Sequence, residues 1–191
     1  MLTLTKWTSA TAAGRRPTMA KSSGGVRNVS VGSAAYNNRL AEVAAMRASG
    51  KYSSVEMAEN GTGWVAIENS PAKHKPEEIE AARILANHGY KVTLGNEAGN
   101  ATVNEGKLFL SSYEQRTPDG KNNTSTNIKN ALGHARDKHA KIAVIYQKNG
   151  KHTREQVEQG IRDFEAASKY RFKKIIIVTR DGRLHNHRHN D

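Results

Sequence analysis

The chain contains no cysteine among its 191 residues, and aromatic residues make up only 6% of it. Without cysteine it forms no disulfide, no zinc–cysteine site and no thiol nucleophile. No apolar run approaches the roughly 20 residues of a membrane-spanning helix. The first residues, Met1–Gly14, are rich in Thr and Ala and lack the apolar block of a secretory signal. We therefore expect a soluble chain with neither a signal peptide nor a membrane span.

Four common catalytic motifs are also missing. The sequence holds no Walker phosphate loop, no dinucleotide-binding glycine motif, no Gly-x-Ser-x-Gly turn and no His-Glu-x-x-His helix. These absences weigh against nucleotide-dependent enzymes and against the commonest hydrolases.

Acidic residues are scarce at both ends of the chain, whose formal net charge is +12. Residues 1–50 carry 7 Lys and Arg against 1 acid, residues 51–168 carry 16 against 15, and residues 169–191 carry 7 against 2. Basic ends on a nearly neutral body attract a polyanion, so we expect nucleic acid as a partner. The alternative is a basic tail that serves solubility, since no aromatic residues for base stacking interleave the N-terminal charges.

The composition divides the chain into three parts. Residues 1–35 are dominated by small, polar and basic residues, which predicts a disordered basic arm. Residues 36–62 predict a short helix, at about 37–49, followed by a linker. Residues 63–191 predict a single α/β domain.

Within this domain, apolar periodicity and turn signals predict alternating strands and helices. Pro76 and the acidic residues after it suit a first helical turn, and Thr153 with Gln156 forms a capping box. We expect a turn at Glu105–Gly106. The predicted helices are 76–88, 127–139 and one from Thr153 onward, and the predicted strands are 64–67, 90–94, 107–116, 142–146, 174–179 and 183–187. This order predicts an α/β fold with a mixed central sheet flanked by about three helices.

A carboxylate and a guanidinium end the predicted strand 107–116. Glu114 and Arg116 are two residues apart, so their side chains point to the same face of a strand. One interpretation is a functional site, and the other is a solvated salt bridge between neighbours on a strand edge.

Several segments resemble the C-terminal, tRNase-like nuclease modules of contact-dependent growth inhibition toxins and related C-terminal domains of phage head proteins. The segments are Pro76–Val92, Gly106–Phe109, Asn127–Leu132 and Ile175–Gly182, within a resemblance that covers about residues 63–187. It implies a PD-(D/E)XK-nuclease-like fold that cleaves RNA, such as tRNA, or DNA. It also implies a cognate immunity protein, and a location in the cytoplasm, in a virion or in the cytoplasm of a target cell.

In that family a helix Glu, a hairpin Asp and a strand acid followed by Lys hold a divalent metal. By position the helix acid is Glu80 or Glu78, the hairpin position falls near Asn104, and the strand motif matches Glu114-Gln115-Arg116. The resemblance therefore implies Glu80, Asn104 and Glu114 as ligands of Mg²⁺ or another divalent cation, with Arg116 as a further catalytic group.

Two positions depart from the family pattern. Asn104 removes a ligand charge, and Arg116 binds phosphate but does not exchange a proton as a tuned Lys does. If the register is counted from Gly106 instead, Leu110 or Ser111 occupies the acid position and the metal site is lost.

Basic and histidine-rich turns allow a metal-free RNase as a further alternative, because His, Arg, Lys and Thr can act as acid, base and phosphate clamp. The candidates for nucleic-acid binding are Lys73, His74, Lys75, His152, Thr153 and Arg154. The last three open a predicted helix, where backbone donors favour an anion. The remaining alternative is an inactive nuclease-like fold that binds nucleic acid or serves as a structural module of a virion.

Overall fold

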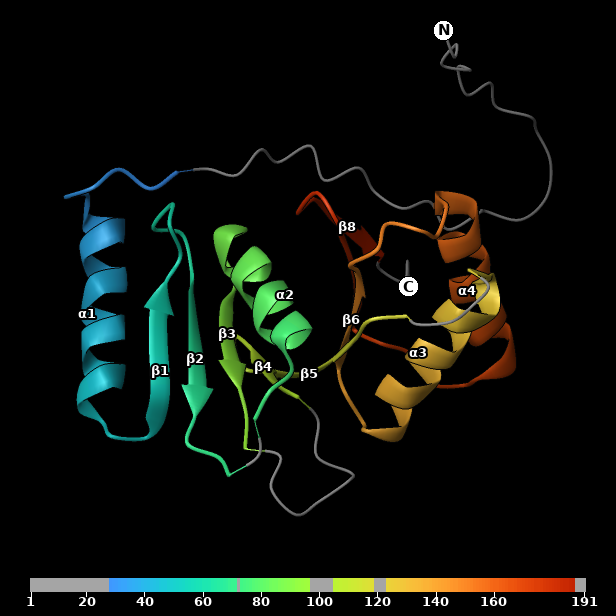
Figure 1. The fold of residues 1–191 in the computed structure, drawn as a ribbon, viewed down its shortest axis with the longest axis horizontal. Helices are drawn as coiled ribbons and strands as arrows, with labels where there is room; N and C mark the ends of the chain where they lie inside the picture. The colour runs from blue at the N-terminus through green and yellow to red at the C-terminus, as the bar shows by residue number, and fades with distance from the viewer. Residues whose placement is uncertain (1–27, 72, 97–104, 119–122, 188–191) are drawn as a thin grey trace, which may run out of the picture.

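The computed structural model describes residues 28–71, 73–96, 105–118 and 123–187. The helices of this part are α1 (Ala34–Ala48), α2 (Pro76–Asn87), α3 (Ser125–Asp137) and α4 (Arg154–Ala167). The strands are β1 (Tyr52–Met57), β2 (Trp64–Glu68), β3 (Lys91–Leu94), β4 (Gly106–Leu108), β5 (Ser111–Arg116), β6 (Ile142–Gln147), β7 (Lys174–Thr179) and β8 (Leu184–His187). Figure 1 shows α1 and β1 at one side of the molecule and α3 and α4 at the other.

The eight strands of the described residues form one sheet in the order in which they occur along the chain. The pairs β2–β3, β5–β6 and β6–β7 are parallel, and the other neighbours are antiparallel. Strands β2, β3, β5, β6 and β7 therefore run in the same direction. Their C-terminal ends follow one edge of a twisted sheet, which is the edge where open α/β sheets bind ligands.

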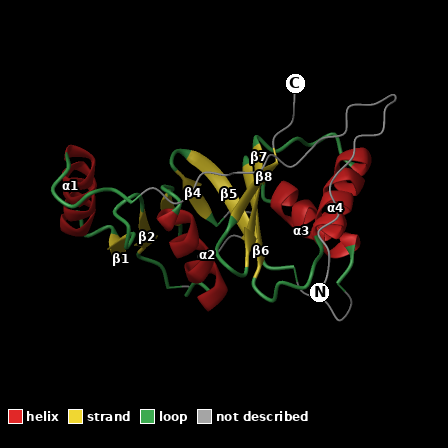
Figure 2. Cartoon of the chain, turned by 90° about the horizontal axis from the view of Figure 1, so that it is seen from above, coloured by secondary structure: helices red, strands yellow, loops and turns green. Residues whose placement is uncertain are grey.

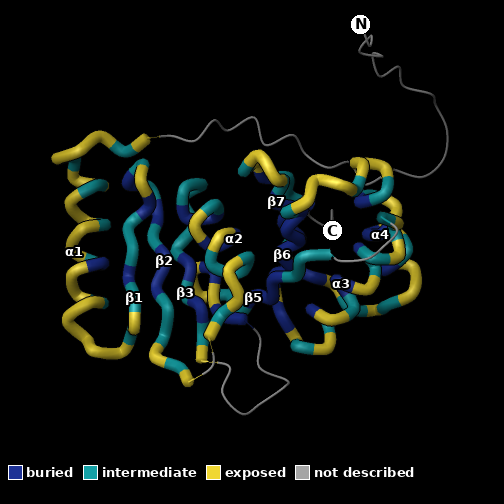
Figure 3. The backbone as a smooth tube through the Cα atoms, in the orientation of Figure 1, coloured by how far each residue is buried: buried dark blue, intermediate teal, exposed yellow. Residues whose placement is uncertain are grey.

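Helices cover both faces of the sheet (Figure 2). On one face, Leu85 of α2 packs with Val144 and Ile176 of the central strands. On the other, α3 and α4 pack on Ala143, Ile145, Ile175 and Ile177. Alternate residues of β6 thus enter two cores, which explains its unbroken apolar sequence. Figure 3 shows this burial along β6 and the exposed outer side of α1.

The predicted α/β class with a mixed central sheet is confirmed. Its assignment to the PD-(D/E)XK nuclease fold stays a prediction. Thr153 is the N-cap of α4, and its side chain accepts a hydrogen bond from the Gln156 backbone as the capping box requires. In the part of the chain that the structure describes, no helix has both the length and the apolar character needed to cross a membrane.

The hairpin turn predicted at Glu105–Gly106 is wrong. Gly106 lies inside the sheet as the first residue of β4, and the turn falls at Phe109–Leu110. A Cβ atom on Gly106 would lie 1.9 Å from the Thr93 carbonyl oxygen, so glycine is needed here for close strand approach and not for a turn. Phe109 instead adopts the positive φ, at 54°.

The segment expected as a linker, within 36–62, contains strand β1. It pairs with β2 and contributes Val55 to a small core with Val43 of α1 and Ala66. Ser53 and Ser54 interrupt its apolar pattern, and pairing to β2 outweighs that weak propensity. The expected arm lies outside the described residues as far as residue 27, and α1 begins at Ala34 after the N-cap Ser33.

Candidate metal and nucleic-acid site

Three ionisable side chains meet at the N-terminal end of α2. His74 lies just before the helix, Glu78 lies in its first turn, and Glu105 immediately precedes β4. His74 Nδ1 is 3.6 Å from Glu78 Oε2 and 3.6 Å from Glu105 Oε1. One ligand atom from each residue lies within 4.8 Å of the others. We call His74, Glu78 and Glu105 the carboxylate cluster.

The local sequence of α2 fixes the position of Glu78. Pro76 is the first helical residue, and Glu78 is the third. The Lys75 backbone N–H donates to Glu78 Oε2 over 2.8 Å, which is the backbone half of a capping box. A carboxylate is favoured there because the first turn of a helix carries the positive end of its dipole. Helix capping therefore holds the same Oε2 atom that faces His74.

Glu114 joins the cluster to the sheet. Its Oε2 accepts a hydrogen bond of 2.9 Å from the Glu105 backbone N–H, and its Oε1 lies 2.8 Å from Arg116 Nη2. The predicted pair is thus a salt bridge between neighbours on one strand face. It is not a solvated one, because Glu114 is only 2% exposed. Glu114 therefore fixes both the backbone that carries Glu105 and the guanidinium of Arg116.

Contacts within the cluster shift the pKa values of His74 and Glu78 in opposite directions. The contacts with Glu105 and then Glu78 raise the pKa of His74 to about 10, against the opposing effect of burial. Burial acts to raise the pKa of Glu78, but its contacts with His74, the Lys75 amide and Glu105 outweigh burial and lower that pKa. The His74 side chain is 4% exposed, and its Nε2 has no hydrogen-bond partner among the described residues. At neutral pH the metal-free cluster thus holds a protonated imidazole against two carboxyl groups.

The same three residues offer ligand atoms to a divalent metal ion. Ligand atoms about 2.1 Å from one ion are at most about 4.2 Å apart. Both His74 contacts, at 3.6 Å, meet that limit, and the three atoms together lie within 4.8 Å of one another. One imidazole and two carboxylates suit Mn²⁺, Zn²⁺ or Fe²⁺, whereas Mg²⁺ prefers oxygen ligands alone. A metal would replace the His74 proton, because a ligating histidine must be neutral.

The metal ligands expected from the sequence lie differently. Glu80 is exposed on α2, where its Oε2 is 3.6 Å from Lys148 Nζ, and it gives no atom to the carboxylate cluster. Burial, together with the contact with Glu80, raises the pKa of Tyr146 to about 12. Asn104 lies outside the described residues. The helix acid that joins the cluster is Glu78, the other candidate from the same turn.

Glu105 was not predicted as a site residue, because Glu105–Gly106 read as a turn. His74 was expected to contact nucleic acid, whereas it lies in the cluster. The available signal was the spacing of His74 and Glu78 around the start of a helix, which places both at its N-terminal end. Lys73 and Lys75, the other two members of that basic triplet, are exposed beside the cluster.

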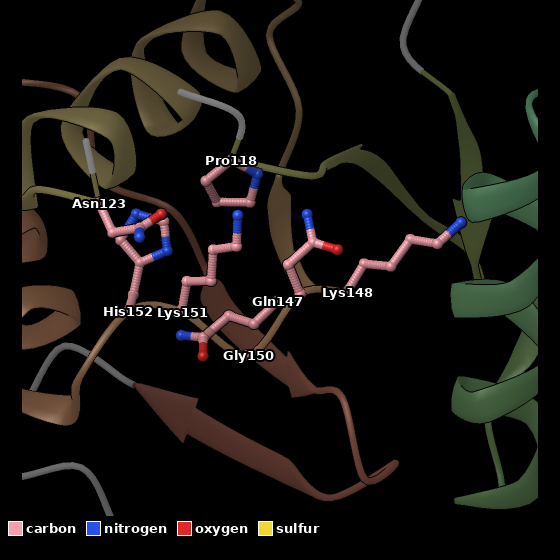
Figure 4. Close-up of a pocket in the computed structure, with 8 residues that line it drawn as sticks. Pro118, Asn123, Gln147, Lys148, Gly150, Lys151 and His152 are labelled. Atoms are coloured by element: carbon pink, nitrogen blue, oxygen red, sulfur yellow. The ribbon is translucent and has the colours of Figure 1, made fainter. Parts of the chain in front are cut away.

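The other expected nucleic-acid residues, His152, Thr153 and Arg154, lie where the loop after β6 enters α4. This loop carries Lys148 and Lys151 around a narrow polar hollow of about 10 Å³, which has room for roughly one water molecule. In Figure 4 the Lys148 side chain extends towards α2, away from His152 and Asn123. The loop therefore reaches across the same edge of the sheet as the carboxylate cluster.

No protein-family model matches the chain, and no curated protein matches it. Among solved structures, the chain is similar to one in a CdiA-CT/CdiI toxin and immunity complex from Burkholderia pseudomallei. The TM-score is 0.48 at 16% sequence identity, over 64% of this chain and 98% of that chain. A similarity of this degree transfers no activity, substrate or partner.

Proposed function

We propose that this chain is a divalent-metal-dependent nuclease that cleaves phosphodiester bonds in RNA or DNA. The observation that carries the proposal is the close approach of His74, Glu78 and Glu105. Glu114 links this cluster to Arg116, because it accepts a hydrogen bond from the Glu105 backbone and forms a salt bridge with the Arg116 guanidinium at the sheet edge. Buried ionisable groups with shifted pKa values at a ligand-binding edge are typical of functional sites.

His74, Glu78 and Glu105 would hold the metal ion. When bound, such an ion supplies charge neutralisation at a phosphate and a water of lowered pKa. The imidazole favours Mn²⁺ or Zn²⁺ over the Mg²⁺ expected from the sequence, because Mg²⁺ keeps a shell of oxygens.

Arg116 is the group that would bind the phosphate. Its side chain is 34% exposed, while the salt bridge to the buried Glu114 fixes its direction. A guanidinium matches the geometry of two phosphate oxygens. The exposed Lys73 and Lys75 flank the cluster, and the net charge of +12 attracts a polyanion.

A second candidate is a nucleic-acid-binding module without catalysis, and the raised pKa of His74 favours it. A protonated His74 already places a positive charge against Glu78 and Glu105 and so stabilises the fold without a metal. In this case Arg116 and the neighbouring lysines would bind the strand, and the cluster would be structural.

The two candidates differ in a cleavage assay. We would incubate the purified full chain with total tRNA and with plasmid DNA, in Mn²⁺, Zn²⁺, Mg²⁺ or EDTA. Metal-dependent cutting supports the nuclease. Salt-sensitive binding without cutting in any metal supports the binding module, and cutting of RNA that survives EDTA would move the site to the His152 turn.

A role as a toxin with a cognate immunity protein remains a part of the proposal that derives from the sequence resemblance. So does transport in a virion or delivery to a target-cell cytoplasm. Growth arrest on expression in a bacterial host, lost in a Glu105→Gln variant, would support the toxin role. Normal growth with soluble, active protein would contradict it.

A further inference from the structure

A larger hollow lies under the N-terminal end of α4, on the sheet face that α3 and α4 cover. Its volume is about 170 Å³, and its walls come from the end of β6, the first turn of α4, β7 and β8. It shares no residue with the carboxylate cluster. We call it the α4 pocket.

Two polar groups line the α4 pocket without a hydrogen-bond partner in the described ranges. Gln147 is 9% exposed as a residue, and the atoms of its carboxamide keep some contact with solvent. His152 Nε2, in contrast, is fully buried without a partner among those residues. Burial lowers the pKa of His152, so its ring is neutral at pH 7. Leaving the buried His152 nitrogen unpaired destabilises the fold, and a ligand that pairs with it removes that cost.

The pocket also has apolar walls that suit a flat ring. Val157 and Ile177 are each 1% exposed and line it from opposite elements, α4 and β7. A cavity of about 150 Å³ accepts a benzene molecule. The α4 pocket, at about 170 Å³, therefore accepts a single six-membered ring with its substituents and leaves little room for a second fused ring.

Two basic residues lie at or near the pocket. Arg154 lines it at the first helical position, where its guanidinium forms a salt bridge of 2.8 Å with Glu158, and Lys151 lies on the preceding loop near His152 (Figure 4). The N-terminus of this 14-residue helix carries the positive end of the helix dipole and favours an anion, although the Gln156 N–H is already bonded to Thr153. A ring in the pocket would thus have its phosphate beside Arg154 and the helix end.

We propose that the α4 pocket binds one unpaired pyrimidine base of a nucleic-acid strand, with the adjoining phosphate held at Arg154 and the N-terminus of α4. The Gln147 carboxamide offers a donor and an acceptor side by side, which can pair with the edge of a base, and the pocket volume of about 170 Å³ favours the single ring of a pyrimidine. The loop after β6 lies on the same sheet edge as the carboxylate cluster, so one strand can contact both. The inference rests on the proposed function only in that this strand is the substrate.

The test is equilibrium binding of the full chain to short fluorescent oligo(U), oligo(C) and oligo(A), in EDTA to prevent metal-dependent cleavage. The wild type should bind the two pyrimidine strands about tenfold more tightly than oligo(A). Gln147→Met keeps the side-chain volume but removes both hydrogen-bonding atoms, and it should abolish that preference by weakening the binding of oligo(U) and oligo(C). Gln159→Met, on an exposed position of α4, is the matched control.

Equal affinities of the wild type for all three strands would overturn the inference, as would an unchanged preference in Gln147→Met. If that variant fails to fold, the wild type decides alone: uridine monophosphate should shift the NMR ring signals of His152 and His185, and adenosine monophosphate should not. Identical shifts with both nucleotides would also overturn it. Because neither assay involves cleavage, a nuclease without pyrimidine preference contradicts only the pocket, and a preference without cleavage contradicts only the proposed function.

Discussion

His74 Nδ1 lies 3.6 Å from Glu105 Oε1, although one residue precedes α2 and the other precedes β4. The contact forms because β3 and β4 pair antiparallel after the α2 crossover. Glu78, from the helix between them, completes the cluster. The charge contacts among these three groups determine the pH dependence of stability and of metal binding at the site.

The first prediction concerns the pH dependence of stability. The pKa of His74 is raised to about 10 in the folded chain from about 6.5 when unfolded. Its contribution is therefore fully present below about pH 6.5 and is lost as the pH rises towards 10. Between these limits the free energy of unfolding of the wild type, measured with urea, should fall by roughly 3 to 5 kcal/mol relative to that of His74→Gln. Parallel pH profiles would show that His74 is not charged in the fold.

The second prediction concerns metal binding. Mn²⁺ should raise the melting temperature of the wild type, release a proton from His74 and bind more tightly as the pH rises. Glu78→Gln should weaken binding by about tenfold or more, since a ligand charge is lost, and calorimetry in two buffers would measure both effects.

Glu80→Gln is the matched control for Glu78→Gln, since it removes an exposed acid from the same helix. It should leave the Mn²⁺ affinity unchanged. Equal losses of Mn²⁺ affinity in the two variants would mean that the ion is attracted by the general negative charge of α2 and is not bound by the carboxylate cluster.

The third prediction concerns the Glu114–Arg116 pair. Arg116→Ala would remove the salt bridge between Arg116 and the buried Glu114, so we expect the free energy of unfolding to fall by about 2 kcal/mol, which urea unfolding would measure. Arg116→Lys should restore part of that loss but not phosphate binding, because an ammonium lacks the two-pronged geometry. If the free energy of unfolding of Arg116→Ala changes by less than about 0.5 kcal/mol, the pair behaves as a solvent-exposed salt bridge that contributes little to stability.

The fourth prediction compares two glycines. Gly106→Ala places a Cβ 1.9 Å from the Thr93 oxygen, so β4 must shift and the chain should lose about 3 kcal/mol or more. Gly133→Ala, where a Cβ in α3 meets nothing within 4 Å, should instead stabilise by up to about 1 kcal/mol. An unchanged or higher melting temperature of Gly106→Ala would contradict the close strand approach.

The sequence predicted those elements whose signals are local. The Thr153 capping box marks the start of α4, and the unbroken apolar run at 142–146 reports a strand buried on both faces. Gly106 was misread because a glycine that allows strands to approach closely looks the same in sequence as a glycine in a turn. The approach of Thr93 is set by tertiary pairing, which no local pattern records.

The site was predicted in part for the same reason. Glu78 and Glu80 share the start of α2, but residues two apart on a helix point to different sides. Only the packing of α2 decides that Glu78 faces the cluster and Glu80 faces Lys148. Glu105 depends on the register of β4 against β5, which shifts with the position of the turn.

The most direct test of the proposed nuclease is the rate of tRNA and plasmid cleavage by wild type, Glu105→Gln and Glu77→Gln at one saturating Mn²⁺ concentration. Glu77 shares the first turn of α2 with Glu78 but lies outside the cluster. We predict a loss of about a hundredfold or more in Glu105→Gln, with wild-type rates in Glu77→Gln. Undiminished cutting by Glu105→Gln would contradict a catalytic role for the carboxylate cluster.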